Sequence, residues 1–599
     1  MRLLQLFKNI ELKHVISRFW LAVLFSTISS ICLFILINDN FGFQYNDDNS
    51  HSFLSTPNDF IILSMIGGLG FLGAINWRLI IENYICKPLY QYLSLAILLG
   101  LIGLYYFYLY STGINDEKTI FRYMGMLLFL HLTISYIPFF KSKAKLDSFW
   151  EYNRQLFSKF FTSAFFTVVI FLGISLALLA LEYLFGLSSN KGKVYGQLFA
   201  LLAGIFHPIY FLSEFPKNIT EIRPSTLAKS FNILVVYILI PITILYLGIL
   251  YAYGIKIGVQ ATLPQGWVSK LVLSFSIIGT LTYLLNYMIP LQSSSKLSGL
   301  FKKYFFPFLL IPIGLLFIAI YVRINEYGIT EPRYIVAILA LWLLFISTYI
   351  IVSTKDNIKI IPITLSAIVL ISLFSPLNMF RISIDHQFKT LKKTLQENGM
   401  LVEEKLSKAV DVNEEAQNLI AGKISYLYYA ENLNLLKSLS SDSVDLSFIH
   451  SDKDGKTYSD LKNTCDALGI SMYSRYNRYR NANLIYLRAE EESTIDIKGY
   501  DHFGFFNRYN ETRDYNLEQI DNTHRFKLHH PVIKTLELDL SPFITGLLSS
   551  EESRRPLDEM TYTFNEDSIK VKIIFTTLSI EKKSDETLLT NYKGYILIK

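Results

Sequence analysis

The sequence predicts an all-α polytopic transmembrane bundle of about 11 spans, followed by a C-terminal α+β domain with a largely antiparallel sheet. Three observations lead to this fold class. Hydrophobic residues fill 51% of the 599 positions and the mean hydropathy is +0.33, too apolar for an ordinary soluble chain. Apolar runs of about 20 residues, enough to cross the hydrocarbon core, recur as far as residue 376. Beyond that point charged helices and alternating strands replace them.

The apolar runs predict the membrane-spanning helices directly, because few soluble helices are so long and so free of charge. The eleventh run is the shortest, since Lys355 and Lys359 leave few residues between it and the tenth. The runs lie near residues 19–37, 60–77, 90–110, 121–140, 160–183, 194–213, 231–253, 268–289, 304–322, 334–352 and 358–376. The predicted domains are therefore a transmembrane domain over residues 19–376 and a soluble domain over residues 377–599.

Residues 1–18 form a separate segment with a basic, amphipathic pattern. A helix here would carry apolar side chains on one face and Lys8 and Lys13 off that face; the apolar residues are Leu3, Leu6, Phe7 and Ile10. This pattern is typical of a helix that lies in the cytoplasmic interface of the membrane. A simple extension of the first span explains it equally well.

The charges of the loops predict the orientation of the bundle. With the N-terminus inside, the inner segments hold nineteen lysines and arginines and the outer loops hold six. The outer six are Lys118, Lys191, Lys193, Lys256, Arg323 and Arg333. Because basic loops stay on the cytoplasmic side, an odd number of spans places residues 377–599 outside the cytoplasm. We expect a multi-pass protein of the bacterial inner (cytoplasmic) membrane, with a cytoplasmic N-terminus and a periplasmic C-terminal domain.

The soluble part begins with two helices and continues with strands. A first helix should end at Asn398-Gly399, and a second should start at Asp411 with Glu414 closing a capping box. From about residue 483 the hydrophobic period falls to two, which predicts an antiparallel sheet or sandwich. The expected strands are residues 484–488, 494–500, 525–529, 535–540, 560–564, 568–580 and 587–599.

The junction between the two parts resembles a known family. The stretch Phe374–Ser383 (FSPLNMFRIS) is similar to the end of the membrane region in the bacterial family called domain of unknown function 4153. Residues that follow at matching positions are Gln387, Leu391, Leu395, Asn398, Gly399 and Leu401. Ile495–Asp501 (IDIKGYD) is similar to a strand-and-turn motif of the same family. The resemblance implies an architecture of several spans with a soluble C-terminal domain, and no established activity.

The first external loop contains the most suggestive acidic residues. Asp47 and Asp48 lie about ten residues past the first span. Membrane glycosyltransferases that use polyprenyl-phosphate sugars place a carboxylate in this loop, where it can deprotonate an acceptor or hold a divalent metal. Aspartate and asparagine are also the ordinary residues of a solvated loop.

Transport is a second possible function, and it would need ionisable groups inside the membrane. The candidates are His131 in the fourth span, His207 before a proline in the sixth, and Glu182 at the outer end of the fifth. Hydrogen-bonded or interfacial structural histidines explain the same pattern. Gly67, Gly68, Gly70 and Gly73 form a small-residue stripe on the second span, either for packing or as a dimer seam.

In the soluble part, a strip of alternating rings and guanidinium groups includes Tyr476 and Arg478. Such a strip can bind a glycan or a lipid phosphate, although a solvated segment near lipid headgroups explains it as well. No hydrolase, metalloprotease or P-loop motif occurs, and we expect no metal, no cofactor and no nucleic acid. The sequence favours a non-enzymatic protein that binds or anchors an envelope protein, glycan or lipid, with the glycosyltransferase and the transporter as alternatives.

Overall fold

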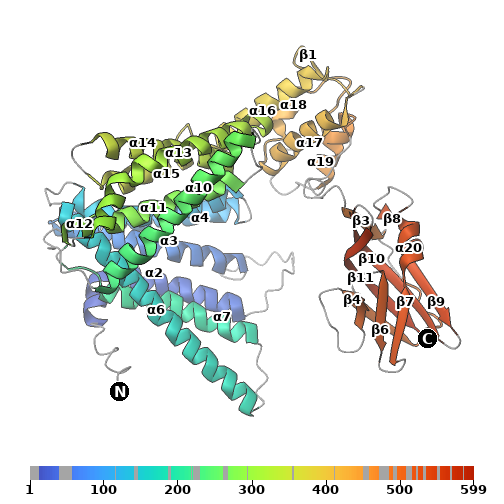
Figure 1. Cartoon of the computed structure of the whole chain (residues 1–599), viewed down its shortest axis with the longest axis horizontal. Coiled ribbons are helices and arrows are strands. Elements are labelled where there is room, and N and C mark those ends of the chain that lie inside the picture. The colour runs from blue at the N-terminus through green and yellow to red at the C-terminus, as the bar shows by residue number, and fades with distance from the viewer. Residues whose placement is uncertain are drawn as a thin grey trace. The chain divides into compact units, whose positions relative to one another are not determined.

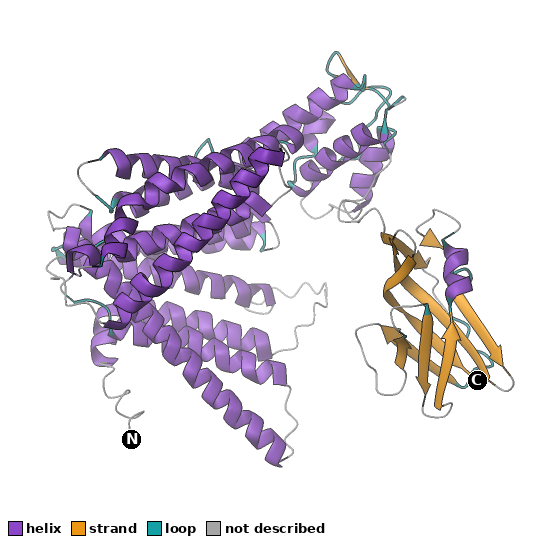
Figure 2. Cartoon of the chain, viewed as in Figure 1, coloured by secondary structure: helices purple, strands orange, loops and turns teal. Residues whose placement is uncertain are grey.

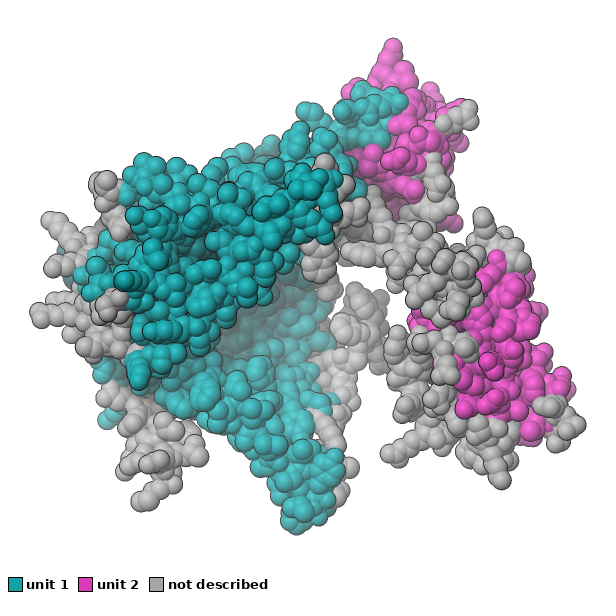
Figure 3. Space-filling model, viewed as in Figure 1, with its two compact units in different colours: residues 1–397, 426–435 teal, residues 398–425, 436–599 magenta. Residues whose placement is uncertain are grey.

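The computed structural model has a helical part (Figure 1) followed by a part rich in strands (Figure 2). It describes residues 12–38, 57–114, 117–140, 146–185, 191–217, 219, 229–260, 267–292, 295–353, 357–410, 412–449, 458–470, 484–489, 495–507, 516–520, 524–530, 534–548, 554–566, 569–583 and 586–599. The chain forms two compact units (Figure 3). The first comprises residues 1–397 and 426–435, and the second comprises residues 398–425 and 436–599.

The helical part confirms the predicted class of fold. Ten helices among the described residues are long and apolar enough to cross a membrane, and a bent pair makes an eleventh candidate. The first five are α2 (Leu12–Asn38), α3 (Pro57–Tyr84), α4 (Pro88–Thr112), α5 (Glu117–Tyr136, extended by a 3-10 turn to Phe139) and α6 (Leu146–Phe185). The last three single helices are α11 (Trp267–Asn286, with α12, Ile289–Gln292, after it), α13 (Lys296–Tyr327) and α14 (Glu331–Val352).

The sixth and seventh spans each contain a π-helical segment. One runs through α7 (Lys191–Leu201), η2 (Leu202–Phe206) and α8 (His207–Ser213), and the other through α9 (Lys229–Asn232), η4 (Ile233–Leu239) and α10 (Ile240–Gln260). Pro208 and Pro241 follow the two π segments closely. Proline has no N–H to donate to the preceding turn, so widening of that turn into a π-helix accommodates it.

The first helix bends at Phe19, whose φ of −125° and ψ of 27° are not helical. Residues 12–18 are helical before this bend and continue as one element with the span. The rest of the predicted interfacial helix, residues 1–11, lies outside the described residues, so that assignment stays a prediction.

The glycine stripe of α3 packs against helices of the same chain. A Cβ atom on Gly67 would lie 2.7 Å from the carbonyl oxygen of Phe25, and one on Gly70 would overlap the ring of Phe25. Gly68 faces the hydroxyl of Tyr123, to which a Cβ atom would lie 2.9 Å away. These close approaches are the packing use of small residues in membrane helices.

The eleventh candidate is α15 (Ile360–Phe374), which a 53° bend separates from α16 (Met379–Glu397). At its start, the amine of Lys359 lies 5.5 Å from the ring centroid of Phe139, at the end of α5. At its other end, Leu373 packs on Gly125, in the first half of α5. Helix α15 therefore runs antiparallel to α5 along the bundle, although its 15 residues make only about 22 Å at 1.5 Å each.

Helix α5 defines the two ends of the bundle. Its last turn packs on Tyr152 of α6, with the rings of Phe139 and Tyr152 5.5 Å apart. Tyr152 in turn contacts Phe215, which follows α8. We call this the Arg18 end, because Arg18 at the start of the first span also faces Phe215. The opposite end, where α5 begins, is called the Phe121 end.

Helix α16 ends where the sequence predicted, because Gly399 adopts a left-handed φ of +69° just after it. The expected start of the next helix was wrong. Helix α17 (Glu414–Tyr429) begins three residues later and is capped by Asn413, whose side-chain oxygen accepts from the backbone N–H of Ala416 at 2.8 Å; Asp411 itself lies outside the described residues. The hairpin β1 (Leu401–Val402) with β2 (Lys405–Leu406) precedes it, and α18 (Asn434–Lys437) and α19 (Tyr458–Ala467) follow.

The C-terminal strands form two sheets around one core. The larger has the order β4-β11-β10-β3-β8 with β9 also paired to β10, and the smaller has the order β5-β6-β7. The strands are β3 (Leu484–Ala489), β4 (His502–Asn507), β5 (Asn516–Gln519), β6 (Arg525–His530), β7 (Lys534–Asp539), β8 (Arg554–Arg555), β9 (Thr561–Glu566), β10 (Ile569–Lys583) and β11 (Glu586–Ile598), with α20 (Ser541–Leu547) after β7. Phe526 and Leu538 of the smaller sheet share a buried core with Phe575 and Ile596 of the larger one. This arrangement is a sandwich.

One predicted strand, residues 494–500, was wrong. Residues 495–500 form a turn in which the N–H of Tyr500 donates to the carbonyl of Ile497 at 3.2 Å. Gly499 adopts a φ of +86° in this turn. The alternation of Ile495 and Ile497 imitates a strand, but the left-handed glycine directs the chain into β4 instead.

Candidate functional site

Four of the residues singled out from the sequence lie outside the described residues. They are Asp47 and Asp48 of the first loop, and Tyr476 and Arg478 of the tyrosine–arginine strip. Their proposed roles stay predictions.

His131 lies on the outside of the bundle. It belongs to α5, where its side chain is exposed while Thr133 and Ile134 nearby are buried. In a bilayer, this position faces lipid or a neighbouring protein rather than the interior of the bundle.

His207 is held by a hydrogen bond to a serine of another helix. Its Nδ1 lies 2.9 Å from the hydroxyl of Ser163 in α6, and the same hydroxyl lies 2.9 Å from the carbonyl oxygen of His207. Ser163 is fully buried, and the ring of Phe160 stacks edge-on to the imidazole at 5.1 Å. This arrangement joins α6 to α8 just after the π segment.

Glu182 lies far from this pair. It belongs to the same continuous helix as Ser163, α6, but nineteen positions farther along. At 1.5 Å per residue, that separation is about 28 Å. The structure therefore does not bring Glu182 and His207 into one site.

The most strongly organised charges of the bundle lie at the Arg18 end. The guanidinium of Arg18 donates from Nε and Nη2 to the two carboxylate oxygens of Glu82, each at 2.8 Å. Its Nη1 donates to the carbonyl of Pro216 at 2.8 Å. The rings of Phe19 and Phe215 lie 4.8 and 5.6 Å from the guanidinium carbon, and only 6% of the Arg18 side chain is exposed. Arg18 thus ties together the first span, the second span and the end of the sixth.

Two further charged contacts extend this group. Arg78 donates from Nε to Glu82 at 2.8 Å, so one carboxylate serves two guanidinium groups. Glu151, which is fully buried, accepts from Arg154 at 2.6 and 2.9 Å and from the side chain of Gln155 at 2.9 Å. Bidentate arginine–carboxylate pairs of this kind are strongly directional. Their geometry fixes where the helix ends lie.

The Phe121 end contains a second cation, which is half-buried. Arg122 of α5 donates from Nη1 to the hydroxyl of Tyr108 in α4 at 2.6 Å. The ring of Phe380 in α16 lies 5.1 Å from the guanidinium carbon, and Phe380 also packs edge-on against Phe121. Arg122 therefore joins two spans to the first helix that follows the membrane region.

Helix α16 is fastened to the loop between α13 and α14. The side-chain amide of Gln387 donates to the carbonyls of Tyr327 and Ile329, both at 2.9 Å. His386 accepts from the backbone N–H of Ile329 at 3.2 Å. Gly328 adopts a φ of +75°, and a Cβ atom there would lie 2.8 Å from the Gln387 amide nitrogen. The loop thus requires glycine at this position for both its backbone and its close approach to α16.

The segment 426–435 is fastened to the same end of the bundle. The hydroxyl of Tyr426 donates to a carboxylate oxygen of Glu331 at 2.7 Å, and the amine of Lys118 donates to the carbonyl of Ala430 at 2.7 Å. Burial, together with the nearby Glu331 carboxylate, raises the pKa of Tyr426 well above its ordinary value. The phenol therefore stays protonated and able to donate.

The C-terminal sandwich presents an aromatic edge. Strand β4 is the last strand at one side of the larger sheet among the described residues. Phe503 and Phe505 on this strand are 48% and 41% exposed. The ring of Tyr595 in the neighbouring β11 stacks on Phe503 at 5.4 Å with planes 17° apart, and meets Phe505 at 5.8 Å. These three rings form one continuous surface, which we call the β4 aromatic edge.

The described residues contain no group of three or more metal-ligating side chains. Burial raises the pKa of the Cys465 thiol to about 12, so it stays protonated and unreactive. Among the described residues there is therefore no cluster of metal-ligating side chains, and Cys465 does not present a reactive thiolate.

Comparison with known families decides the classification. The family model described as "Domain of unknown function (DUF4153)" matches residues 51–407. The chain belongs to this family. The DUF4153 match begins before α3 and ends just after β2, so it includes Glu82, Arg122 and Gln387 and leaves out Arg18 and the sandwich.

A curated relative is similar over part of the same length. "Uncharacterized protein PM1469" of Pasteurella multocida (strain Pm70) is 24% identical over 315 residues, which is 52% of this chain and 52% of that protein. The chain thus aligns with about half the length of this relative. No solved structure matches the chain.

Sequence reasoning missed the charged residues that organise the two ends of the bundle. Arg18 and Arg78 were only counted among the cations of the inner segments, where charge is expected and draws no attention, and Glu82 was not singled out. Arg122 was hidden inside the fourth apolar run. A usable signal did exist for Arg122, because an arginine inside an apolar run is rare and requires a partner.

Proposed function

We propose that this protein anchors a binding domain at the outer face of the bacterial inner membrane, and that the domain binds a partner protein of the cell envelope by strand addition at β4. The helical bundle is the anchor, and the C-terminal sandwich is the binding domain. The side of the membrane, the binding activity and the partner are all part of this proposal.

The observation that carries this proposal is the β4 aromatic edge. Edge strands of natural sheets are usually protected by lysine, proline, a bulge or a covering element. Strand β4 reads His-Phe-Gly-Phe-Phe-Asn, without lysine or proline, and its two outward phenylalanines are exposed. An extended peptide that adds to such an edge gains main-chain hydrogen bonds, and it can place alternate side chains on the aromatic surface.

The contacts inside the bundle support an anchoring role. The Nδ1 atom of His207 is hydrogen-bonded to Ser163, and His131 faces outward. At the Phe121 end, Gln387 and Tyr426 fasten the start of the C-terminal region to the outer loops. Such fastening suits a bundle that serves as the anchor for the chain that follows it.

Two arguments together support the proposed side of the membrane. The loops with the most lysine and arginine belong to the end where Arg18, Arg78 and Arg154 lie, which the charge bias assigns to the cytoplasm. Helix α15 carries the chain from that end to the other, so α16 begins at the Phe121 end. We place the C-terminal domain outside the cytoplasm on these grounds.

Site-specific photo-crosslinking in intact cells tests the proposal. A photoreactive amino acid at Phe503 should give a protein adduct of discrete mass, whereas the same probe at Thr563, an exposed residue of β9, should not. Combining the probe at Phe503 with Phe505→Lys should abolish the adduct, because a charge on an edge strand blocks strand addition.

Three outcomes would refute strand addition at β4. The first is no adduct at Phe503, and the second is the same adduct from both probe positions. The third is an adduct that persists with Phe505→Lys. If purified protein instead binds an envelope glycan through the same rings without any protein adduct, the partner is a saccharide and our assignment is wrong.

Transport is a second candidate, and the two π segments favour it. π-helical turns inside membrane helices frequently mark functional sites, and η2 and η4 lie in consecutive spans. Uptake or efflux that is lost with Pro208→Ala and Pro241→Ala, while the adduct at Phe503 is retained, would support transport over anchoring. The glycosyltransferase alternative still depends on Asp47 and Asp48, which lie outside the described residues.

A further inference from the structure

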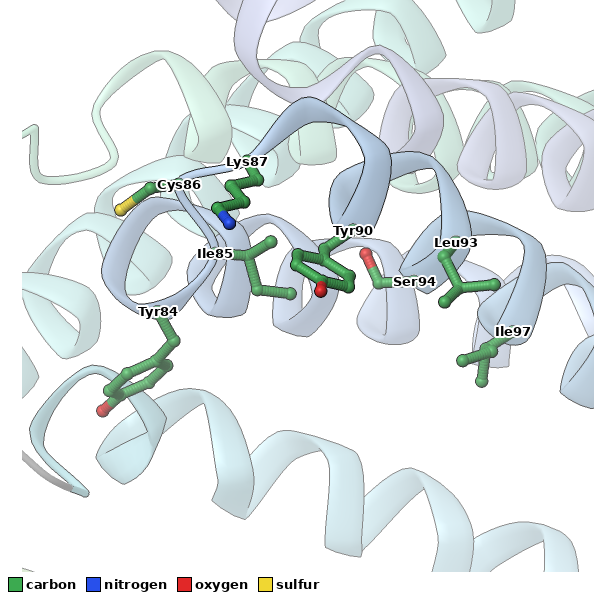
Figure 4. Close-up of a pocket in the computed structure, with 8 residues that line it drawn as sticks. All are labelled: Tyr84, Ile85, Cys86, Lys87, Tyr90, Leu93, Ser94 and Ile97. Atoms are coloured by element: carbon green, nitrogen blue, oxygen red, sulfur yellow. The ribbon is translucent and has the colours of Figure 1, made fainter.

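We propose that the elbow between α3 and α4 binds one anionic phospholipid from the cytoplasmic leaflet. A pocket of about 480 Å³ lies at this elbow (Figure 4). Its lining includes Tyr84, Cys86, Lys87 and Tyr90 at the turn, and Leu93 farther along α4. The polar groups of the pocket lie at the turn, where a lipid headgroup would bind. The apolar groups lie along α4, where the acyl chains would follow.

The apolar half of the pocket continues onto the outer surface of the bundle. Leu93 and Ile97 lie one turn apart on α4 and are 55% and 56% exposed. Among the residues of α4, Leu109 alone is buried, so this helix faces away from the bundle over most of its length. An acyl chain that lies along Leu93 and Ile97 would cover a surface that is already lipid-facing in a bilayer.

The polar half suits a phosphate. Lys87 is the N-cap residue of α4 and Pro88 begins the helix, so this lysine stands at the positive end of a 25-residue helix. The hydroxyl of Tyr84 donates to the carbonyl of Ile137 at 2.6 Å, which fixes its ring at one wall of the pocket. The nearest carboxylate in sequence, Glu82, is already engaged with two arginines and leaves the charge of Lys87 available.

The position of the α3–α4 elbow across the bilayer determines which leaflet supplies the lipid. The elbow follows the last two turns of α3, which carry Arg78 and Glu82 at the Arg18 end. Under the proposed orientation this end lies at the cytoplasmic surface, where lysine and arginine attract anionic lipids. A net negative headgroup is therefore favoured over a zwitterionic one.

The chain provides a built-in reporter for this site. Of its three cysteines, Cys32 and Cys465 are buried, and Cys86 on the pocket wall is exposed. A bimane fluorophore on Cys86 of the full-length protein, in phosphatidylcholine nanodiscs, reports contact with brominated lipids. Brominated phosphatidylglycerol at a low mole fraction should quench the bimane with about fivefold higher apparent affinity than brominated phosphatidylcholine, as expected for one basic residue near the surface.

Variants of Lys87 distinguish a specific lipid-binding site from a general effect of surface charge. Lys87→Gln should reduce the preference for phosphatidylglycerol to about that of phosphatidylcholine, and Lys87→Arg should keep it. Lys229→Gln, which removes an exposed lysine at the start of α9, should leave it unchanged. Equal quenching by the two lipids in the wild type, or a preference that survives Lys87→Gln, would overturn the proposal.

Discussion

Replacing Glu82 with glutamine is expected to destabilise the bundle strongly. Glu82→Gln keeps the shape of the side chain but removes the negative charge that faces Arg18 and Arg78. Because Arg18 is only 6% exposed, its guanidinium would keep a charge without a compensating carboxylate. Loss of one partner of a fully buried pair typically costs about 3–5 kcal/mol, and the 23% exposure of the Glu82 side chain puts this pair toward the lower end of that range. Thermal unfolding of the detergent-solubilised protein should show a markedly lower midpoint.

Two variants make this result specific. Glu326→Gln makes the same chemical change on an exposed carboxylate at the end of α13, and it should leave the midpoint close to that of the wild type. The double change Arg18→Met with Glu82→Met should recover much of the loss, because it removes both charges of the pair and leaves Arg78 free to reach solvent. If Glu82→Gln and Glu326→Gln unfold at the same temperature, the Arg18 network is not a stabilising element.

Replacing Gly594 with valine is expected to disrupt the larger sheet of the sandwich. Gly594 in β11 pairs with Phe575 in β10, next to a register shift between Phe575 and Thr577. A Cβ atom at this position would overlap the carbonyl oxygen of Ile574 and lie 3.0 Å from the Cα of Phe575. These are backbone atoms, so only movement of a strand can relieve the clash. Overpacking of this kind costs about 1–3 kcal/mol or more.

Hydrogen exchange of the full-length protein measures the effect of Gly594→Val locally. Amides of β10 and β11 should exchange much faster in the variant, whereas those of α2 and α3 should be unchanged. Gly546→Ala in α20 is the matched control, because a Cβ atom there meets no other atom within 4 Å. Unchanged exchange in β10 and β11 would contradict the close approach at Gly594.

The fold was predictable where one physical requirement dominates the sequence. Membrane helices must be long and apolar, so each of the eleven apolar runs corresponds to a described helix, including the short α15. The stop at Gly399 was also predictable, because few residues other than glycine adopt its positive φ easily. The start of α17 was not, since Asp411 and Asn413 are both good capping residues and only the folded geometry selects Asn413.

The candidate site was less predictable because its contacts are distant in the sequence. Arg18 and Glu82 are 64 positions apart, and Tyr426 and Glu331 are 95 apart. Each residue taken alone has an ordinary explanation as an interfacial charge or a surface tyrosine. The role of these groups as fasteners follows only from the packing of the spans. The same holds for Phe503, since strand order determines that β4 is an edge.

The side of the membrane on which the sandwich lies tests the proposed anchor most directly. A membrane-impermeant maleimide can be applied to sealed spheroplasts that contain the full-length protein, either with native Cys86 or with Thr563→Cys in a Cys86→Ser background. Cys86 is exposed at the α3–α4 elbow, and Thr563 is exposed on β9. We expect the cysteine at position 563 to be labelled in sealed spheroplasts, and Cys86 to be labelled only after permeabilisation. Labelling of both in sealed spheroplasts, or of position 563 only after permeabilisation, would contradict an eleven-span anchor with an external binding domain.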